Sequence, residues 1–131
     1  EIKDSAPKGI SEMHAINYAF DNSNIINNST FIIKITGRYF VPELEEYLYG
    51  FDLKKYDCLS QSKNGIYKNQ CEIVGCNKQI FKTFFSVDNV QPHVENTYAE
   101  RCSAYENVLT CKVFNISPTQ MGGIAEIRTT L

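Results

Sequence analysis

Three short segments of the chain carry side chains that could bind an anion or move a proton. The first begins with Lys8 and Gly9, just before a stretch with helical spacing. A glycine ahead of a helix lets backbone amides approach an anion, and the lysine adds a positive charge. The alternative is structural, because many helices simply begin with a glycine followed by a capping residue.

The second segment is KITGRY, residues 34–39, where an apolar strand is expected to end. Ligands of open α/β sheets bind beyond the carboxyl ends of strands. Lys34 is unfavourable to bury in such a strand unless it meets an anion or a carboxylate, and Arg38 offers a planar fork that suits phosphate. A structural ion pair between Lys34 and a glutamate, or a lysine that extends to solvent, is the alternative.

The third segment is His93-Val94-Glu95 at the start of a late helix, with Asp88 upstream. One of these side chains could act as a general base, since acids and bases are well placed on loop–helix junctions above a pocket. The alternative is that Glu95 only favours the positive end of its own helix.

An α/β arrangement is expected to position these segments, because helix and strand signals alternate along the chain. Ser11 can cap the first helix, since its hydroxyl accepts an amide hydrogen that has no partner within the helix. Pro42 and Gly50 bound a second, acidic helix. Helices are predicted at residues 11–22, 42–50 and 93–107, strands at residues 31–36, 57–61, 72–76, 79–85 and 109–116, a loop at residues 1–9, and turns at Asn64-Gly65 and Asn77-Lys78.

The clearest strand is FIIKIT, residues 31–36. It is β-branched and aromatic and nearly apolar on both faces, as a central strand of a covered parallel sheet would be. Because side chains alternate along a strand, the even-numbered residues, which include Lys34 and Thr36, share one face and the odd-numbered residues share the other.

Composition restricts the class of protein. The 131 residues are enough for one domain with a core, and a hydrophobic fraction of 43% is that of an ordinary soluble globular protein. A net charge of −2 without clustered Lys and Arg gives no sign of a nucleic-acid surface, and no apolar run is long enough for a membrane span. Five cysteines cannot all pair internally and none lies in a CxxC pair, so free, buried cysteines in the cytosol are expected rather than a zinc site.

Taken together, these segments resemble a known family. The stretches KGISEMHAINYAF and STFIIKITGRYFVPELEEYL resemble the middle of small GT-A-type glycosyltransferases, of a kind met in bacterial surface-polysaccharide clusters and some large viruses. There a K-G-x-x-E helix leads into a strand that ends in K-x-T-G-R-Y. The tail PHVENTYAERCSAYENVLTCKVFNISPTQMGG is similar to the end of the same domain, so the resemblance covers about residues 7–125.

The resemblance implies an incomplete GT-A-like, Rossmann-related α/β domain with three layers and a mixed sheet. Residues 1–131 would be a single partial catalytic domain, a fragment whose missing N-terminal part grips the nucleotide base. The implied activity is transfer of a sugar from a nucleotide-sugar donor to a saccharide acceptor in the cytoplasm, with no nucleic-acid partner and no transmembrane segment. The implied donor-binding residues are Lys8, Gly9, Glu12, Lys34, Thr36, Gly37, Arg38 and Tyr39, and the implied catalytic base is Glu95, with Asp88 second.

One departure from the family concerns the metal. Many GT-A enzymes carry an Asp-x-Asp motif that binds a divalent cation at the end of the corresponding strand, but Gly37-Arg38-Tyr39 stands there and no Asp-x-Asp occurs in the chain. Cationic side chains can neutralise the leaving diphosphate instead. Lys34, Arg38 and Lys8 are expected to do so, and a Mn²⁺ or Mg²⁺ cofactor is left open.

The alternative function is a non-catalytic module that binds carbohydrate or protein. Eight Tyr and eight Phe would supply stacking surfaces without any catalytic residue. The two functions differ in their cations, because only the enzyme needs Lys34 and Arg38 to converge on one cleft. If the first half of the domain is absent, the apolar faces of FIIKIT are expected to be partly uncovered and the chain to self-associate through that edge.

Overall fold

Alternating apolar residues build a four-stranded sheet. The structure, a computed structural model, describes residues 8–61, 70–122 and 124–131. In spatial order the strands are β1 (Phe31–Ile35), β3 (Ile73–Asn77), β2 (Cys58–Ser60) and β4 (Val108–Thr110). Strands β1 and β2 both pair antiparallel with β3, while β2 and β4 pair in parallel. The fold therefore combines helices and strands around a mixed sheet, as the α/β prediction states.

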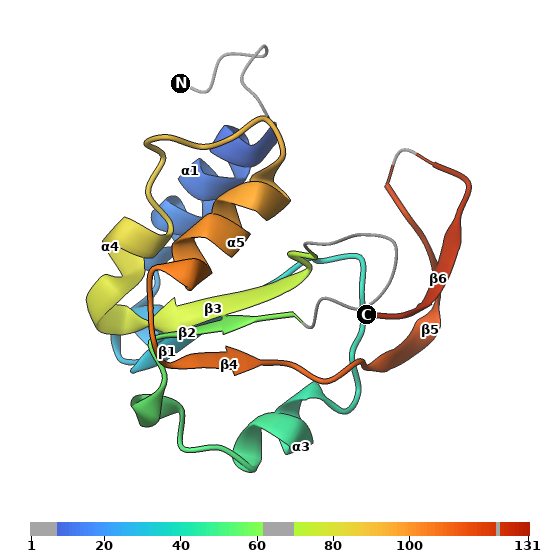
Figure 1. Cartoon of the computed structure of the whole chain (residues 1–131), viewed down its shortest axis with the longest axis horizontal. Coiled ribbons are helices and arrows are strands. Elements are labelled where there is room, and N and C mark those ends of the chain that lie inside the picture. Colours follow the sequence, from blue (N-terminus) through green and yellow to red (C-terminus); the bar gives the residue numbers. More distant parts are fainter. Residues whose placement is uncertain (1–7, 62–69, 123) are drawn as a thin grey trace.

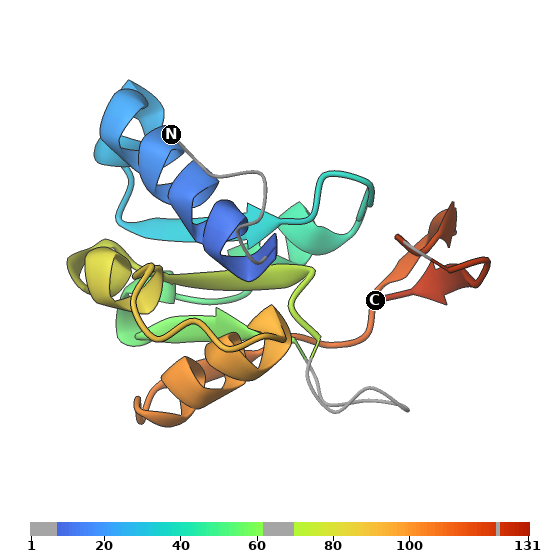
Figure 2. The ribbon, with the colours of Figure 1, turned by 90° about the horizontal axis from the view of Figure 1, so that it is seen from above.

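Helices cover both faces of this sheet, which gives three layers (Figure 1). Helices α1 (Lys8–Asn22), α4 (Phe81–Phe84) and α5 (Val94–Ser103) lie on one face, and α3 (Leu44–Tyr49) lies on the other. Seen from above, α1 lies towards β1 and α5 towards the opposite edge (Figure 2). The remaining helical segments are short: α2 (Asn24–Asn27) and the 3-10 turns η1 (Leu53–Lys55) and η2 (Lys78–Ile80).

The alternation of side chains divides the core into two clusters, one on each face of the sheet. In β2, Cys58 packs with the α1 and α5 face while Leu59 packs with the α3 face. In β3, Val74 packs with the α1 and α5 face and Ile73 packs with the α3 face. The first cluster also contains Met13, Phe81, Phe84, Phe85 and Tyr98, and the second contains Leu44, Leu109, Phe114, Ile116 and Leu131.

The predicted place of FIIKIT in the sheet is wrong. It is not a central strand of a parallel sheet: β1 pairs antiparallel with β3 and forms the outer edge of the sheet among the described residues. Its apolar faces are explained by cover from above and below, because Ile32 packs with one core cluster and Ile33 with the other. The predicted alternation and the partly uncovered faces are confirmed, since four of its residues are half-buried and Ile35 is exposed.

Two helical predictions need correction. The first helix already includes Lys8, so Ser11 is not its cap. Its first turn packs closely on α5, since an added Cβ at Gly9 would lie 3.0 Å from Val94 Cβ. The predicted strand at residues 79–85 is wrong, because the segment forms η2 and α4. Its buried aromatics, Phe81, Phe84 and Phe85, have the spacing of one helical turn.

The last predicted strand, residues 109–116, is two strands in two sheets. Strand β4 ends at Thr110, and β5 (Asn115–Gln120) pairs antiparallel with β6 (Ile127–Thr130), which the sequence did not predict. Phe114 already belongs to this second pairing, because its N–H donates to Leu131 O and its C=O accepts from Leu131 N. The late helix likewise ends at Ser103, before the predicted residue 107.

The remaining structural predictions have the following outcomes. Strands near residues 57–61 and 72–76 and the helix that ends at Gly50 are confirmed as β2, β3 and α3. All five cysteines are buried and free of disulfides. Among the described residues, no helix has the length and apolar content to cross a membrane. The predicted loop at residues 1–9 is wrong at its end, because Lys8 and Gly9 belong to α1. Its residues 1–7 and the predicted turn at Asn64-Gly65 lie outside the described residues.

Candidate functional site

A polar cleft of about 460 Å³ lies where α1 and α5 begin and β1 ends. The close contact of Gly9 with Val94 joins the first turns of the two helices. The first amides of a helix have no partner within the helix and carry the positive end of its dipole. Both helices therefore turn an end that favours anions towards the cleft. The lining residues are Lys8, Gly9, Glu12, Thr36, Arg38, Tyr39, Cys71, Glu72, Pro92, His93, Val94, Glu95, Met121 and Gly122.

Two exposed cations line this cleft, Lys8 and Arg38. Neither pairs with a carboxylate among the described residues. The Arg38 guanidinium lies 5.9 Å from the centroid of the Tyr39 ring and packs closely on Gly122, where an added Cβ would lie 2.2 Å from Arg38 Nη1. The glycine thus leaves room for the guanidinium at the mouth of the cleft.

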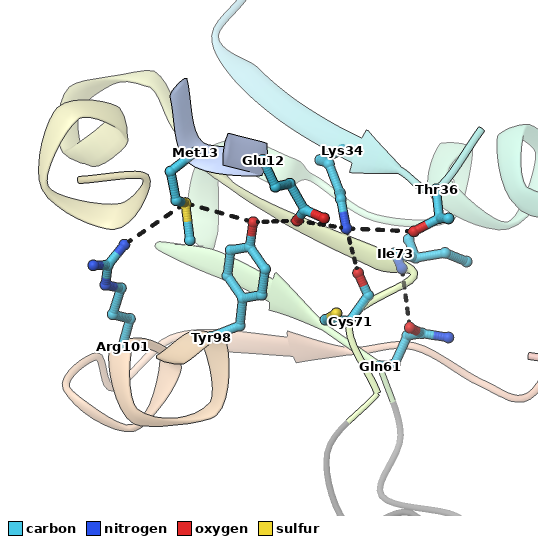
Figure 3. A network of polar contacts seen from close by, with 9 residues as sticks. All are labelled: Glu12, Met13, Lys34, Thr36, Gln61, Cys71, Ile73, Tyr98 and Arg101. Carbon is cyan, nitrogen blue, oxygen red and sulfur yellow. Dashed lines mark hydrogen bonds and ion pairs between the residues drawn. The ribbon is translucent and has the colours of Figure 1, made fainter. Parts of the chain in front are cut away.

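Behind the cleft, Lys34 belongs to a buried polar network (Figure 3). Its Nζ lies 2.9 Å from Glu12 Oε1 and donates to the Cys71 carbonyl at 2.8 Å and to Thr36 Oγ1 at 3.4 Å. An ammonium has three N–H donors, so these three acceptors satisfy it. The side chain is only 11% exposed. The structural alternative for Lys34, an ion pair with a glutamate, is therefore what the fold contains.

Tyr98 completes the network from α5. Its hydroxyl donates to Glu12 Oε1 at 2.8 Å, and its ring centroid lies 5.5 Å from Lys34 Nζ. Burial raises the pKa of Tyr98, and the neighbouring Glu12 carboxylate raises it further, so the phenol stays protonated and remains a donor. Burial also raises the pKa of the Cys71 thiol to about 12, which leaves it unreactive at neutral pH.

The carboxylates of the cleft differ in their partners. Glu12 is held by Lys34, and Glu72 Oε1 lies 2.6 Å from Arg128 Nη1. The Glu72–Arg128 pair is largely buried and connects β6 to the start of β3. Glu95 has no ion pair among the described residues, so it faces the cleft as a half-buried acid. Among the cleft carboxylates of the described residues, Glu95 is thus the one without a cationic partner.

The structure brings most of the predicted site residues together. Asp88 lies elsewhere: it accepts a hydrogen bond from the Ser86 hydroxyl and lines a separate depression with Arg101. Gly37 follows β1 but does not line the cleft, and Lys34 lies behind it, where its ammonium contacts the lining residues Glu12, Thr36 and Cys71. The predicted residues that do line it are Lys8, Gly9, Glu12, Thr36, Arg38, Tyr39 and Glu95.

Sequence reasoning missed several residues of the site. Tyr98 was not among the predicted site residues, and neither were Glu72, Met121 and Gly122. The helical spacing of Tyr98 from the cleft residue Glu95 could have identified it, since residues three apart share a helix face.

A metal site does not follow from the side chains in view. The described part of the chain contains no group of three His, Cys, Asp or Glu side chains that could hold a metal ion together. Two of the cleft carboxylates, Glu12 and Glu72, already pair with cations of the protein. The donor set does not fit a divalent cation, so no chemical step is assigned to one.

Comparisons with protein-family models, curated proteins and solved structures found no match, and the site is therefore interpreted from its own geometry.

Proposed function

We propose that this protein is a glycosyltransferase that moves a sugar from a nucleotide-sugar donor to a saccharide acceptor, with the donor bound in the cleft. The observation that carries the proposal is the mixture of charges there. The cations Lys8 and Arg38 and two helix N-termini favour phosphate. Glu12 is a fixed carboxylate, already paired with Lys34, that accepts hydrogen bonds from hydroxyls. A nucleotide sugar carries both groups in one molecule.

The cleft residues suggest a division of roles. In an inverting transfer, the oxygen of the acceptor hydroxyl attacks the anomeric carbon, the bond from that carbon to the diphosphate oxygen breaks, and the nucleoside diphosphate leaves. Lys8 and Arg38 would stabilise the negative charge that develops on the leaving diphosphate. Glu95 would accept the proton of the acceptor hydroxyl, because it faces the cleft without a cationic partner among the described residues.

The finer fold assignment belongs to the same proposal: a GT-A-like domain whose first half lies outside these 131 residues. What supports it is the open edge of β1, a strand with the apolar composition of a central strand but with one neighbour among the described strands. The proposed cytoplasmic location rests on the five free, buried cysteines.

The test is calorimetric titration of the full-length protein with UDP, GDP, UDP-glucose and GDP-mannose, followed by assays of nucleoside diphosphate release in the presence of saccharides. Binding of at least one nucleotide sugar, together with release of its diphosphate when an acceptor is added, supports the proposal. Failure of all four compounds to bind argues against a nucleotide-sugar site.

One observation favours the second candidate, a non-catalytic carbohydrate-binding module. The enzyme was expected to direct both Lys34 and Arg38 at the ligand, yet the three N–H donors of Lys34 go to protein acceptors. In that case the cleft would bind free saccharides through Glu12 and Glu95. Saccharide binding without any nucleotide binding, and with no release of diphosphate, would favour the module over the enzyme.

A further inference from the structure

The two oxygens of the Glu12 carboxylate have different surroundings. Oε1 accepts hydrogen bonds from the Lys34 ammonium, at 2.9 Å, and from the Tyr98 hydroxyl, at 2.8 Å. Oε2 makes no hydrogen bond among the described residues and is not buried. The side chain is 32% exposed and lines the cleft. One oxygen therefore anchors the group, and the other is left for a ligand.

The anchors come from two different elements, which fixes the direction of the carboxylate. Lys34 is in β1 and Tyr98 is in α5, and Figure 3 shows both reaching Glu12 of α1 from the sheet and the neighbouring helix. A carboxylate with a single partner rotates about its terminal bond, whereas two donors on one oxygen hold it in one orientation. Lys34 is also satisfied by protein acceptors, so it is not free to bind a ligand anion.

The surroundings of the free oxygen define the group that it takes. A carboxylate oxygen is an acceptor, so the ligand must donate a hydrogen. A cationic ligand group is disfavoured by Lys8 and Arg38 in the same cleft, which leaves a neutral donor such as a hydroxyl. Lys8 and Glu12 are one helical turn apart on α1, about 6 Å along the axis, which is comparable to the width of one sugar ring.

We propose that Glu12 Oε2 accepts a hydrogen bond from a hydroxyl of the donor sugar, and that Lys34 and Tyr98 are positioning residues for it. This inference rests on the proposed function, because it places the diphosphate at Lys8 and Arg38. Glu12 then selects for the sugar and contributes nothing to the affinity for the nucleoside diphosphate alone.

The test compares UDP-glucose with UDP, and GDP-mannose with GDP, by calorimetry on the full-length protein and three variants. Glu12→Gln replaces a charge-assisted hydrogen bond by a neutral one, so affinity for the nucleotide sugar should fall about tenfold while affinity for the diphosphate stays unchanged. Tyr98→Phe keeps the charge of Glu12 but removes one of its two anchors. The affinity for the nucleotide sugar should therefore fall less, about threefold, again without a change for the diphosphate. Glu106→Gln removes an equal charge from an exposed position and should change neither affinity.

The outcomes separate this inference from the proposed function. If the wild-type protein binds neither nucleotide sugar nor diphosphate, the proposed function fails. If it binds both and Glu12→Gln lowers the two affinities equally or leaves both unchanged, the role of Glu12 is overturned while the function stands. If Glu12→Gln does not fold, Tyr98→Phe decides alone. The inference is overturned if Tyr98→Phe lowers the affinities for nucleotide sugar and diphosphate equally, or lowers neither.

Discussion

Two depressions flank β1, one on each face of the sheet, and they differ in what lines them. The cleft of about 460 Å³ on the α1 and α5 face collects charged side chains, whereas a groove of about 680 Å³ on the α3 face is mainly apolar. Alternate residues of the same strand and its continuation contribute to both: Thr36 lines the cleft, and Ile33 and Ile35 line the groove. The other apolar and aromatic residues of the groove are Tyr39, Phe40, Val41, Leu44, Leu48, Tyr49, Phe51 and Leu53.

The difference lies in how polar groups find partners. On the cleft side, Lys34 is enclosed by acceptors from three segments of the chain. The outer edge of β1 differs, because there the backbone has no neighbouring strand among the described residues. Lys78 N donates to Thr30 O and Thr36 N donates to Glu72 O, so the backbone groups of even-numbered residues bond to β3 and those of odd-numbered residues point away from it. The cleft therefore gathers polar groups, and the groove is apolar surface beside a strand edge that is unpaired among the described strands.

The largest expected effect is on the proposed base. Glu95→Gln should keep donor binding but lower turnover by about a hundred- to ten-thousandfold, because the amide keeps the shape and loses the proton acceptor. Asp88→Asn is the matched control, since Asp88 lies outside the cleft and should leave turnover unchanged. The measurement is steady-state release of nucleoside diphosphate. If Asp88→Asn abolished turnover while Glu95→Gln did not, the assignment of the base would have to be reversed.

Arg38→Ala tests the phosphate side of the cleft. Removal of the guanidinium should lower kcat/KM about a hundredfold and weaken binding of UDP or GDP, because the charge acts on the diphosphate in both the bound and the leaving state. Phe40→Ala is the control from the groove side, because Phe40 is 72% exposed and lines the groove. Equal losses in the two variants would show that the distinction between cleft and groove has no functional meaning.

The sequence predicted local features of β1 well and its neighbours poorly. The division of Ile32 and Lys34 from Ile33 and Ile35 followed from alternation, which holds in any strand whatever its position in the sheet. The antiparallel pairing with β3 could not follow, because an apolar strand covered on both faces looks alike whether it has one neighbour or two. The neighbour of a strand is decided by contacts distant in sequence.

The site was predicted to a similar extent. Lys8, Arg38 and Glu95 were identified because a helix start and a strand end carry general rules for charge and ligand position. The partner of Lys34 was predicted only as some glutamate, and Tyr98 was not predicted as part of the site. Both come from helices that only the tertiary structure places over β1, so no local pattern of residues identifies them.

A comparison of two lysines tests the energetic difference between the two faces. Lys34→Met should lower the free energy of unfolding by about 2–3 kcal/mol, which is less than for a fully buried pair because Glu12 stays partly exposed. Lys112 pairs with Glu43 near α3, but both side chains are close to half-exposed, so Lys112→Met should change stability by about 1 kcal/mol or less. Urea unfolding of the two variants measures both. A Lys34→Met protein as stable as the wild type would mean that the ion pair only offsets the cost of its own burial.

The smallest expected effect concerns the open edge of β1 beside the groove. A solution of these 131 residues should self-associate as its concentration rises, because the edge offers unpaired backbone groups next to apolar surface. Ile35 is 43% exposed at the end of the strand and lines the groove, so Ile35→Lys should raise the concentration needed for association about tenfold by placing a charge there. Ile25→Lys is the control, since Ile25 is 83% exposed on α2 and does not line the groove. Sedimentation velocity measures the association, and thermal unfolding measures cooperativity. A wild-type chain that stays monomeric and melts cooperatively would show that β1 needs no further neighbour. The proposed missing half of the domain would then lose its structural support.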